Sequence, residues 1–211
     1  MAKAWNPNSP FMKALARVFD LMLLNVLFIV TSLPVVTMGA SLAALHYCLL
    51  HMVRNEEEYI IRSYFLAFRR EFKQATILWI IWLFAAGLLY VDYTLLDKLP
   101  GSSRQMMIGL LAAVAIVLTC ILLYSYPLMA RFENSLRHIV KNALVVSIVF
   151  FARTIAMAAI LFGFCYLYYN LPLQATPFLL LFGFSFPVML MAYIYTPVLK
   201  KMEDNERHLD D

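Results

Sequence analysis

The sequence predicts an all-α integral membrane protein, a bundle of about six transmembrane helices with basic amphipathic cytoplasmic elbows. Apolar residues make up 63% of the chain and charged residues 14%, with a mean hydropathy of +0.76. Soluble domains average roughly 45–50% apolar and about 25% charged residues. In addition, apolar runs of bilayer-spanning length recur, and basic residues flank them instead of forming one patch. This distribution signals membrane topology and excludes a nucleic-acid partner.

The first element is a cytoplasmic N-terminal segment, residues 1–17, that leads into a first span over 18–33. A basic start before an apolar run is also typical of a signal peptide. However, apolar character continues to Val53, past the small residues that resemble a cleavage site. We therefore expect a retained membrane helix.

Pro34 ends the first span, because proline removes a backbone donor and disfavours helix in the preceding residue. A second span follows over 35–53. Both runs are near the lower limit for crossing ~30 Å of hydrocarbon, which takes about 20 residues. Two full crossings are favoured, and a re-entrant hairpin remains the alternative.

The second span carries small residues four positions apart, Gly39 with Ala43 and Ala40 with Ala44. This spacing lets two helix backbones approach closely in lipid, where packing drives association. The polar residues around the break either line a small binding cavity or hydrogen-bond the backbone that Pro34 frees. The candidate residues of this polar turn are Asn25, Thr31, Ser32, Pro34, Thr37, Gly39 and Ser41.

The interval 54–73 predicts a basic amphipathic helix. Its apolar stripe contains Ile61, and its cations lie off that stripe. Such a helix lies flat in the inner interface, packs beneath the bundle, or docks a partner protein. A second polar interval spans 131–142. The candidate interfacial or docking residues are Arg62, Phe65, Phe68, Arg69, Arg70, Phe72 and Lys73 in the first interval, and Arg131, Phe132, Asn134, Arg137 and Lys141 in the second.

Four more apolar runs complete a single membrane domain over 18–199. They predict spans at 75–96, 106–130, 143–169 and 177–199, with the second of these kinked or ended near Pro127. The remaining residues, 200–211, form a charged cytoplasmic tail.

Counting basic residues by loop gives the orientation. Of 17 lysines and arginines, 14 lie in the N-terminal segment, the two polar intervals and the tail, and two lie in the opposite loop. The positive-inside rule then predicts a bacterial cytoplasmic membrane protein with both termini in the cytoplasm.

Arg153 is the one basic residue within a predicted span. An intramembrane charge is a functional candidate by default. Arg153 pairs with Asp20 or Glu133 if the span starts at Ala143, and snorkels to the surface if the span starts near Phe150.

Histidines and cysteines indicate no chemical site. Cys48, Cys120 and Cys165 lie in apolar runs without a CxxC partner, and the histidines have no metal-ligand spacing. The chain also contains no GxSxG, HExxH, P-loop or dinucleotide fingerprint. We therefore expect no catalytic residue, no metal and no cofactor.

Several segments together resemble the bacterial YesL family of multi-pass membrane proteins. They are SLPVVTMGA, the stretch from Arg54 to Ala75, YPLMARFENSL from Tyr126, Lys141-Asn-Ala and Arg153-Thr. The resemblance covers nearly the whole chain. It implies genes beside carbohydrate ABC importers and polysaccharide degradation in Gram-positive bacteria. It transfers no activity and no catalytic residues.

Three function classes follow. The favoured one is a non-enzymatic accessory or regulatory component of carbohydrate uptake, with the lipid bilayer, ABC importer subunits or a second copy as partners. The alternative is a small autonomous transporter or channel with its site at the Pro34 break. The third is a membrane enzyme, which the absence of motifs disfavours.

Overall fold

The computed structural model describes residues 10–56, 59–98, 100–170 and 172–210, and this part of the chain is helical without strands. The elements in chain order are α1 (Pro10–Ser32), η1 (Val35–Thr37), α2 (Met38–Arg54), α3 (Ile60–Leu95), η2 (Leu96–Lys98), α4 (Gly101–Arg131), α5 (Leu136–Val149), α6 (Phe151–Asn170), α7 (Pro172–Phe182) and α8 (Ser185–Asp210).

Five helical segments in the described chain are long and apolar enough to cross a membrane. They are Phe11–Ser32, Val35–Arg54, Ile60–Lys98, Gly101–Arg131 and Phe151–Asn170. A sixth arises if Thr176–Phe182 and Ser185–Asp204, which meet at a bend of 51°, form one span. The predicted fold class, an all-α multi-pass membrane protein, is confirmed.

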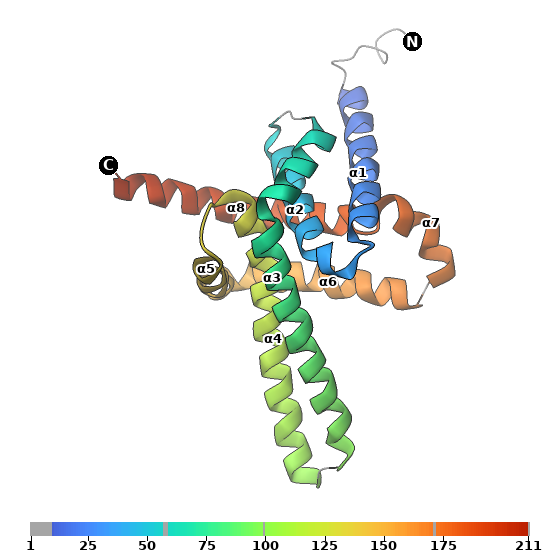
Figure 1. Ribbon diagram of the computed structural model, residues 1–211, viewed down its shortest axis with the longest axis vertical. Coiled ribbons are helices and arrows are strands. Elements are labelled where there is room, and N and C mark those ends of the chain that lie inside the picture. The colour runs from blue at the N-terminus through green and yellow to red at the C-terminus, as the bar shows by residue number, and fades with distance from the viewer. Residues whose placement is uncertain (1–9, 57–58, 99, 171, 211) are drawn as a thin grey trace.

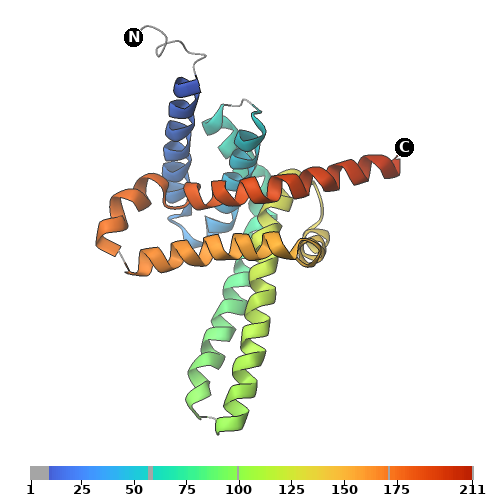
Figure 2. The ribbon, with the colours of Figure 1, turned by 180° about the vertical axis from the view of Figure 1, so that it is seen from behind.

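Helix α2 lies at the centre of the molecule. It contacts α1, α3, α4 and α8. Helices α3 and α4 form a long antiparallel hairpin that projects away from the other helices, and α6 and α8 lie across this hairpin (Figures 1 and 2). The helices therefore do not all run side by side.

The small residues of α2 allow this central position. Gly39, Ala40, Ala43 and Ala44 are buried. A Cβ atom on Gly39 would collide with the carbonyl oxygen of Ala75 and would lie 2.6 Å from the Cβ of Trp79. Only glycine permits this separation of α2 and α3, as the small-residue spacing predicted.

Helix α3 joins two predicted elements into one. The basic interval and the third span are continuous over 36 residues, which at ~1.5 Å per residue is about 54 Å. The chain turns earlier, at Asn55, which closes α2 in the left-handed conformation with φ 59°. The prediction that a separate helix lies flat before the third span is therefore wrong.

The fifth and sixth predicted spans are each divided. Phe150 interrupts 143–169 with φ −107° and ψ 44°, and the hydroxyl of Thr154 donates to the freed carbonyl of Ser147 at 2.8 Å. The interval 177–199 breaks between α7 and α8, near Gly183. The fourth span behaves differently, because α4 continues through Pro127 and ends at Arg131.

Replacing Gly39 by alanine tests the close approach of α2 and α3. We expect Gly39→Ala to lower the free energy of unfolding by about 1–3 kcal/mol, because the added methyl meets backbone atoms of α3. Gly87→Ala is the matched control. A Cβ there meets open space, so the better helix propensity of alanine should leave stability unchanged or raise it by up to about 1 kcal/mol.

The measurement is reversible unfolding of both variants in mixed micelles. Equal stability of Gly39→Ala and the unmodified chain would contradict the packing described.

Candidate functional site

The polar residues of the Pro34 turn (residues 31–41) bond mainly to the chain itself. The Thr31 hydroxyl donates to the Leu27 carbonyl at 2.8 Å, and the Ser32 hydroxyl donates to Ile29 at 3.1 Å. The Ile29 carbonyl is among the last four of α1, which the ending helix leaves without an intrahelical partner, and the Leu27 carbonyl lies in the turn before it.

Thr37 and Ser41 complete the turn. The Thr37 hydroxyl lies 2.6 Å from the carbonyl oxygen of Thr31 and 2.8 Å from that of Pro34. The Ser41 hydroxyl donates to the Thr37 carbonyl at 3.1 Å and lies 3.0 Å from the Thr31 hydroxyl. These bonds match the role of satisfying backbone that Pro34 frees, and they occupy the groups that a binding cavity would offer.

Helix α3 holds the outside of the turn. The indole nitrogen of Trp79 donates to the Val35 carbonyl at 2.8 Å, and the Tyr64 hydroxyl lies 2.7 Å from that of Thr31. The turn itself presents apolar side chains, with Leu33 75% and Val35 61% exposed.

Asn25 hydrogen-bonds the break between α7 and α8, and not the Pro34 turn to which the sequence analysis assigns it. It is completely buried, and its amide nitrogen donates to the carbonyls of Leu179 and Leu180 at 3.0 and 2.8 Å. Its amide oxygen accepts from the backbone nitrogens of Phe184 and Ser185 at 2.8 and 3.1 Å. All four hydrogen-bonding positions of the amide are used. The side chain thus joins α1 to the α7–α8 break, away from Pro34.

The aromatic stripe of the first basic interval faces outward. Ile61 is 52%, Phe65 40% and Phe72 37% exposed. The face of α3 that packs inward instead carries Tyr64, Ala67, Glu71 and Ala75. The cations Arg62, Arg69 and Lys73 are exposed, while Arg70 pairs with Glu71 at 2.7 Å and lies 5.1 Å from the ring centroid of Tyr47. Phe68 is half-buried against the core.

The second basic interval likewise contains both exposed and partly buried residues. Arg137 and Lys141 are exposed on α5, whereas Phe132 packs partly against the core. Asn134 is half-buried in the link before α5, and its backbone nitrogen donates to the Phe132 carbonyl at 2.9 Å. Arg131 turns inward to α8.

Two residues outside the predicted set join Arg131 in a cluster. The Glu203 carboxylate accepts from Arg54 Nη2 at 2.7 Å and from Arg131 Nε at 2.6 Å, with a second bond from each guanidinium at 3.3 and 3.2 Å. Its side chain is only 13% exposed. This Glu203 cluster connects the ends of α2 and α4 to α8. The partners are 149 and 72 residues apart, so no local pattern indicates it.

The expected ion pairs of Arg153 do not form. Within the described side chains, no ion pair joins Arg153 to Asp20 or Glu133. Its guanidinium lies 5.5 Å from the ring centroid of Phe150. Since α6 starts at Phe151, Arg153 lies in the first helical turn, and this position favours the alternative in which Arg153 snorkels to the surface.

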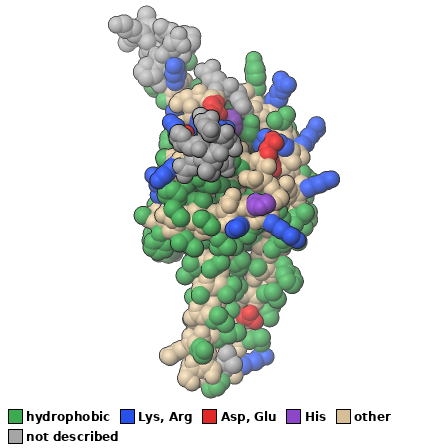
Figure 3. Space-filling view, turned by 90° about the vertical axis from the view of Figure 1, so that its left-hand side faces the viewer, with side chains coloured by type: hydrophobic (Ala, Val, Ile, Leu, Met, Phe, Trp, Pro, Cys, Tyr) green, Lys and Arg blue, Asp and Glu red, His purple; other side chains and the backbone are tan. Residues whose placement is uncertain are grey.

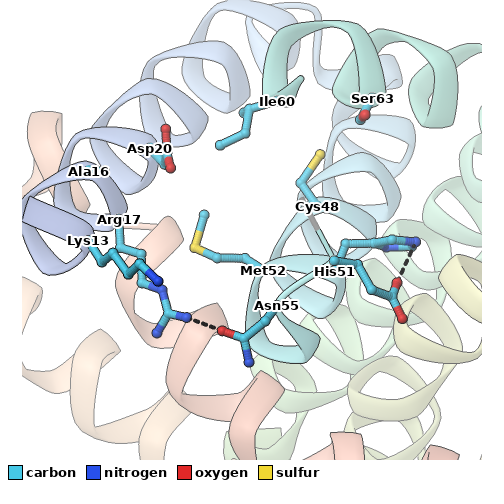
Figure 4. A pocket seen from close by; sticks show the side chains of 11 residues that line it. Lys13, Ala16, Arg17, Asp20, Cys48, His51, Met52, Asn55, Ile60 and Ser63 are labelled. Atoms are coloured by element: carbon cyan, nitrogen blue, oxygen red, sulfur yellow. Dashed lines mark hydrogen bonds and ion pairs between the residues drawn. The ribbon is translucent and has the colours of Figure 1, made fainter. Parts of the chain in front are cut away.

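Asp20 instead lines a pocket between α1, α2 and the start of α3 (Figure 4). The cavity has a volume of about 330 Å³. Helix α1 contributes Lys13, Arg17 and Asp20, and Arg17 contacts the side-chain oxygen of Asn55. On the opposite wall, His51 Nε2 lies 3.2 Å from Glu56.

Charge and apolar surface are separated on the outside of the molecule. Figure 3 shows Lys and Arg side chains around the part away from the hairpin stem, and apolar side chains along the stem. The exposed stem residues include Ile80, Phe84, Leu88, Leu110 and Val117. Such an exposed apolar surface indicates contact with lipid or with another protein.

Comparison with known families gives one match. Residues 21–93 match the model of a family described as "Protein of unknown function, DUF624". The match includes the Pro34 turn, all of α2 and most of α3. No curated protein and no solved structure matches the chain.

Asn25 provides the test of the α7–α8 junction. We expect Asn25→Ala to lower the free energy of unfolding by about 2 kcal/mol or more, because it removes the side-chain partner of the Leu180 carbonyl and of the Phe184 and Ser185 amides at about 1–3 kcal/mol for each group left unpaired. Asn170→Ala is the control, since Asn170 is exposed and makes one bond, to Tyr166.

Unfolding in mixed micelles gives the stability, and limited proteolysis near Gly183 reports the junction. Unchanged stability and unchanged cleavage in Asn25→Ala would show that the junction holds without this side chain.

Proposed function

We propose that this chain is a YesL-like, non-enzymatic accessory or regulatory component of bacterial carbohydrate uptake. It would reside in the cytoplasmic membrane with both termini in the cytoplasm. The family matched at residues 21–93 has no described activity, so the carbohydrate context comes from the resemblance to YesL.

The observation that carries the proposal is which groups the interior polar side chains hydrogen-bond. Those at the Pro34 turn and at Asn25 bond to the chain's own backbone. A transport pathway needs polar groups that face a water-filled passage. This use of the interior supports a binding role over an autonomous transporter with its site at Pro34.

The outer surface supplies features that suit a partner. A shallow hollow on α3 is lined by Arg62, Phe65, Leu66 and Arg69. Exposed cations combined with exposed aromatic rings can bind an acidic, partly apolar segment of a cytoplasmic or membrane subunit. Arg137 and Lys141 add positive charge on α5.

The charge distribution supports the orientation. In the predicted six-span topology, the basic intervals fall on the same side of the membrane as the N-terminal segment and the tail, and the basic residues of the loop at the hairpin tip are Lys98 and Arg104. With the hairpin across the bilayer, the positive-inside rule leaves the hollow on α3 facing the cytoplasm.

Affinity purification from native membranes in mild detergent, followed by mass spectrometry, tests the proposal. We expect stoichiometric ABC importer subunits with the unmodified chain. The triple variant Arg62→Gln, Arg69→Gln, Lys73→Gln should copurify with at least about tenfold less of the importer subunits, because it loses several charged contacts across an interface. Arg104→Gln, at the hairpin tip, is the matched control.

Recovery of a homo-oligomer without importer subunits would overturn the proposal that the chain forms a stable complex with the importer. Flux of a sugar through vesicles that contain the purified chain alone would favour the transporter instead.

A further inference from the structure

The pocket lined by α1, α2 and α3 lies where the charged start of α1 meets its apolar run. Lys13, Arg17 and Asp20 are spaced four and three residues apart, so they share one side of the helix. The other side of α1 exposes Phe11, at 64%, and Phe19, at 68%. A helix segment that is apolar on its outer side and charged on the side that faces a cavity is typical of a membrane–water interface.

The charged side chains that line the described part of the pocket are not all paired with one another. Within the described side chains, neither Lys13 nor Asp20 has a hydrogen-bond or ion-pair partner. Arg17 contacts the neutral amide of Asn55 and not the carboxylate one turn away (Figure 4). His51 and Glu56 face each other at 3.2 Å. Within the described lining side chains, the groups left for a ligand are therefore the Lys13 ammonium, the Asp20 carboxylate and those guanidinium donors of Arg17 that Asn55 does not use.

This arrangement matches a zwitterion with an anionic and an ammonium end. Arg17 and Asp20 are three residues apart, about 4.5 Å along the helix axis. A phosphate group accepts charge-assisted hydrogen bonds from guanidinium and ammonium groups, and a primary ammonium donates them to a carboxylate. In phosphoethanolamine, two carbon atoms separate the phosphate ester oxygen from the nitrogen, so the two ends can reach Arg17 and Asp20 together.

The rest of the lining suits the remainder of a lipid. Cys48, Met52 and Ile60 form an apolar wall beside the charged residues. Basic pockets between membrane helices are known sites for lipid head groups.

We propose that this pocket binds the phosphoethanolamine group, with Lys13 and Arg17 on the phosphate and Asp20 on the ammonium. Phosphatidylethanolamine at the bilayer surface and free phosphoethanolamine carry the same recognised chemistry. Neither the family match nor the proposed docking role assigns such a site.

The test is lipid retention by the purified full-length chain in mild detergent, read by native mass spectrometry. Phosphatidylethanolamine, phosphatidylcholine and phosphatidylglycerol are added together as an equimolar mixture. We expect about tenfold tighter binding of phosphatidylethanolamine than of phosphatidylcholine, whose quaternary nitrogen has no N–H to donate to Asp20. Soluble phosphoethanolamine is then added as a competitor, and displacement at concentrations similar to the lipid's would identify the free compound as the ligand.

Variants separate the two ends of the site. Asp20→Asn should abolish the preference over phosphatidylcholine, and Lys13→Gln with Arg17→Gln should weaken all three phospholipids. Asp92→Asn, toward the far end of α3, is the control. The ratio of the two lipids within one sample is independent of how much protein is folded. Equal retention of both lipids by the unmodified chain, or an unchanged ratio in Asp20→Asn, would overturn the proposal.

Discussion

The approach of α2 to α3 at Gly39 is the constraint on which the rest of the structure depends. With no side chain on Gly39, the helix reaches the backbone of α3 at Ala75. This position lets α2 contact α1, α4 and α8 as well. Packing of small residues is the interaction available to helices in lipid, where burial of apolar surface offers little gain.

Three helix breaks in the described apolar segments are stabilised in one way, by a side chain that replaces lost backbone bonds. Thr37 does so at the Pro34 turn, Thr154 at Phe150, and Asn25 at the α7–α8 junction. Lipid cannot supply these hydrogen bonds, so the chain must. Polar residues that resemble a transport site from their position in the sequence are accounted for by this need. Among the described side chains, Lys13 and Asp20 at the α1–α3 pocket have no such bond to the chain.

The predictable parts of the molecule rest on local signals. Composition indicates the membrane class, Pro34 marks a break, and the spacing at Gly39 indicates close packing. The prediction of a separate basic elbow before the third span is wrong for α3, which is one continuous helix. Charges on one face do not end a helix, and no proline or glycine falls between Ile60 and Ala86.

Other features depend on residues that are distant in the chain. The break at Phe150 has no proline or glycine beside it. The partners of Asn25 lie more than 150 residues away, and Glu203 meets Arg54 and Arg131 only after α8 has folded back. Periodicity and motifs report neighbours within a helix, so they carry no information about such pairs.

Amide hydrogen exchange in lipid nanodiscs tests the central claim, that the polar turn and α2 form a dry structural core. The account predicts the slowest exchange in the chain at Ala40–Leu50, because that face of α2 is enclosed by four helices. Exchange at Ala40–Leu45 as fast as at the exposed start of α3 would contradict it. Such a result would place water along α2 and make the Pro34 turn part of a pathway.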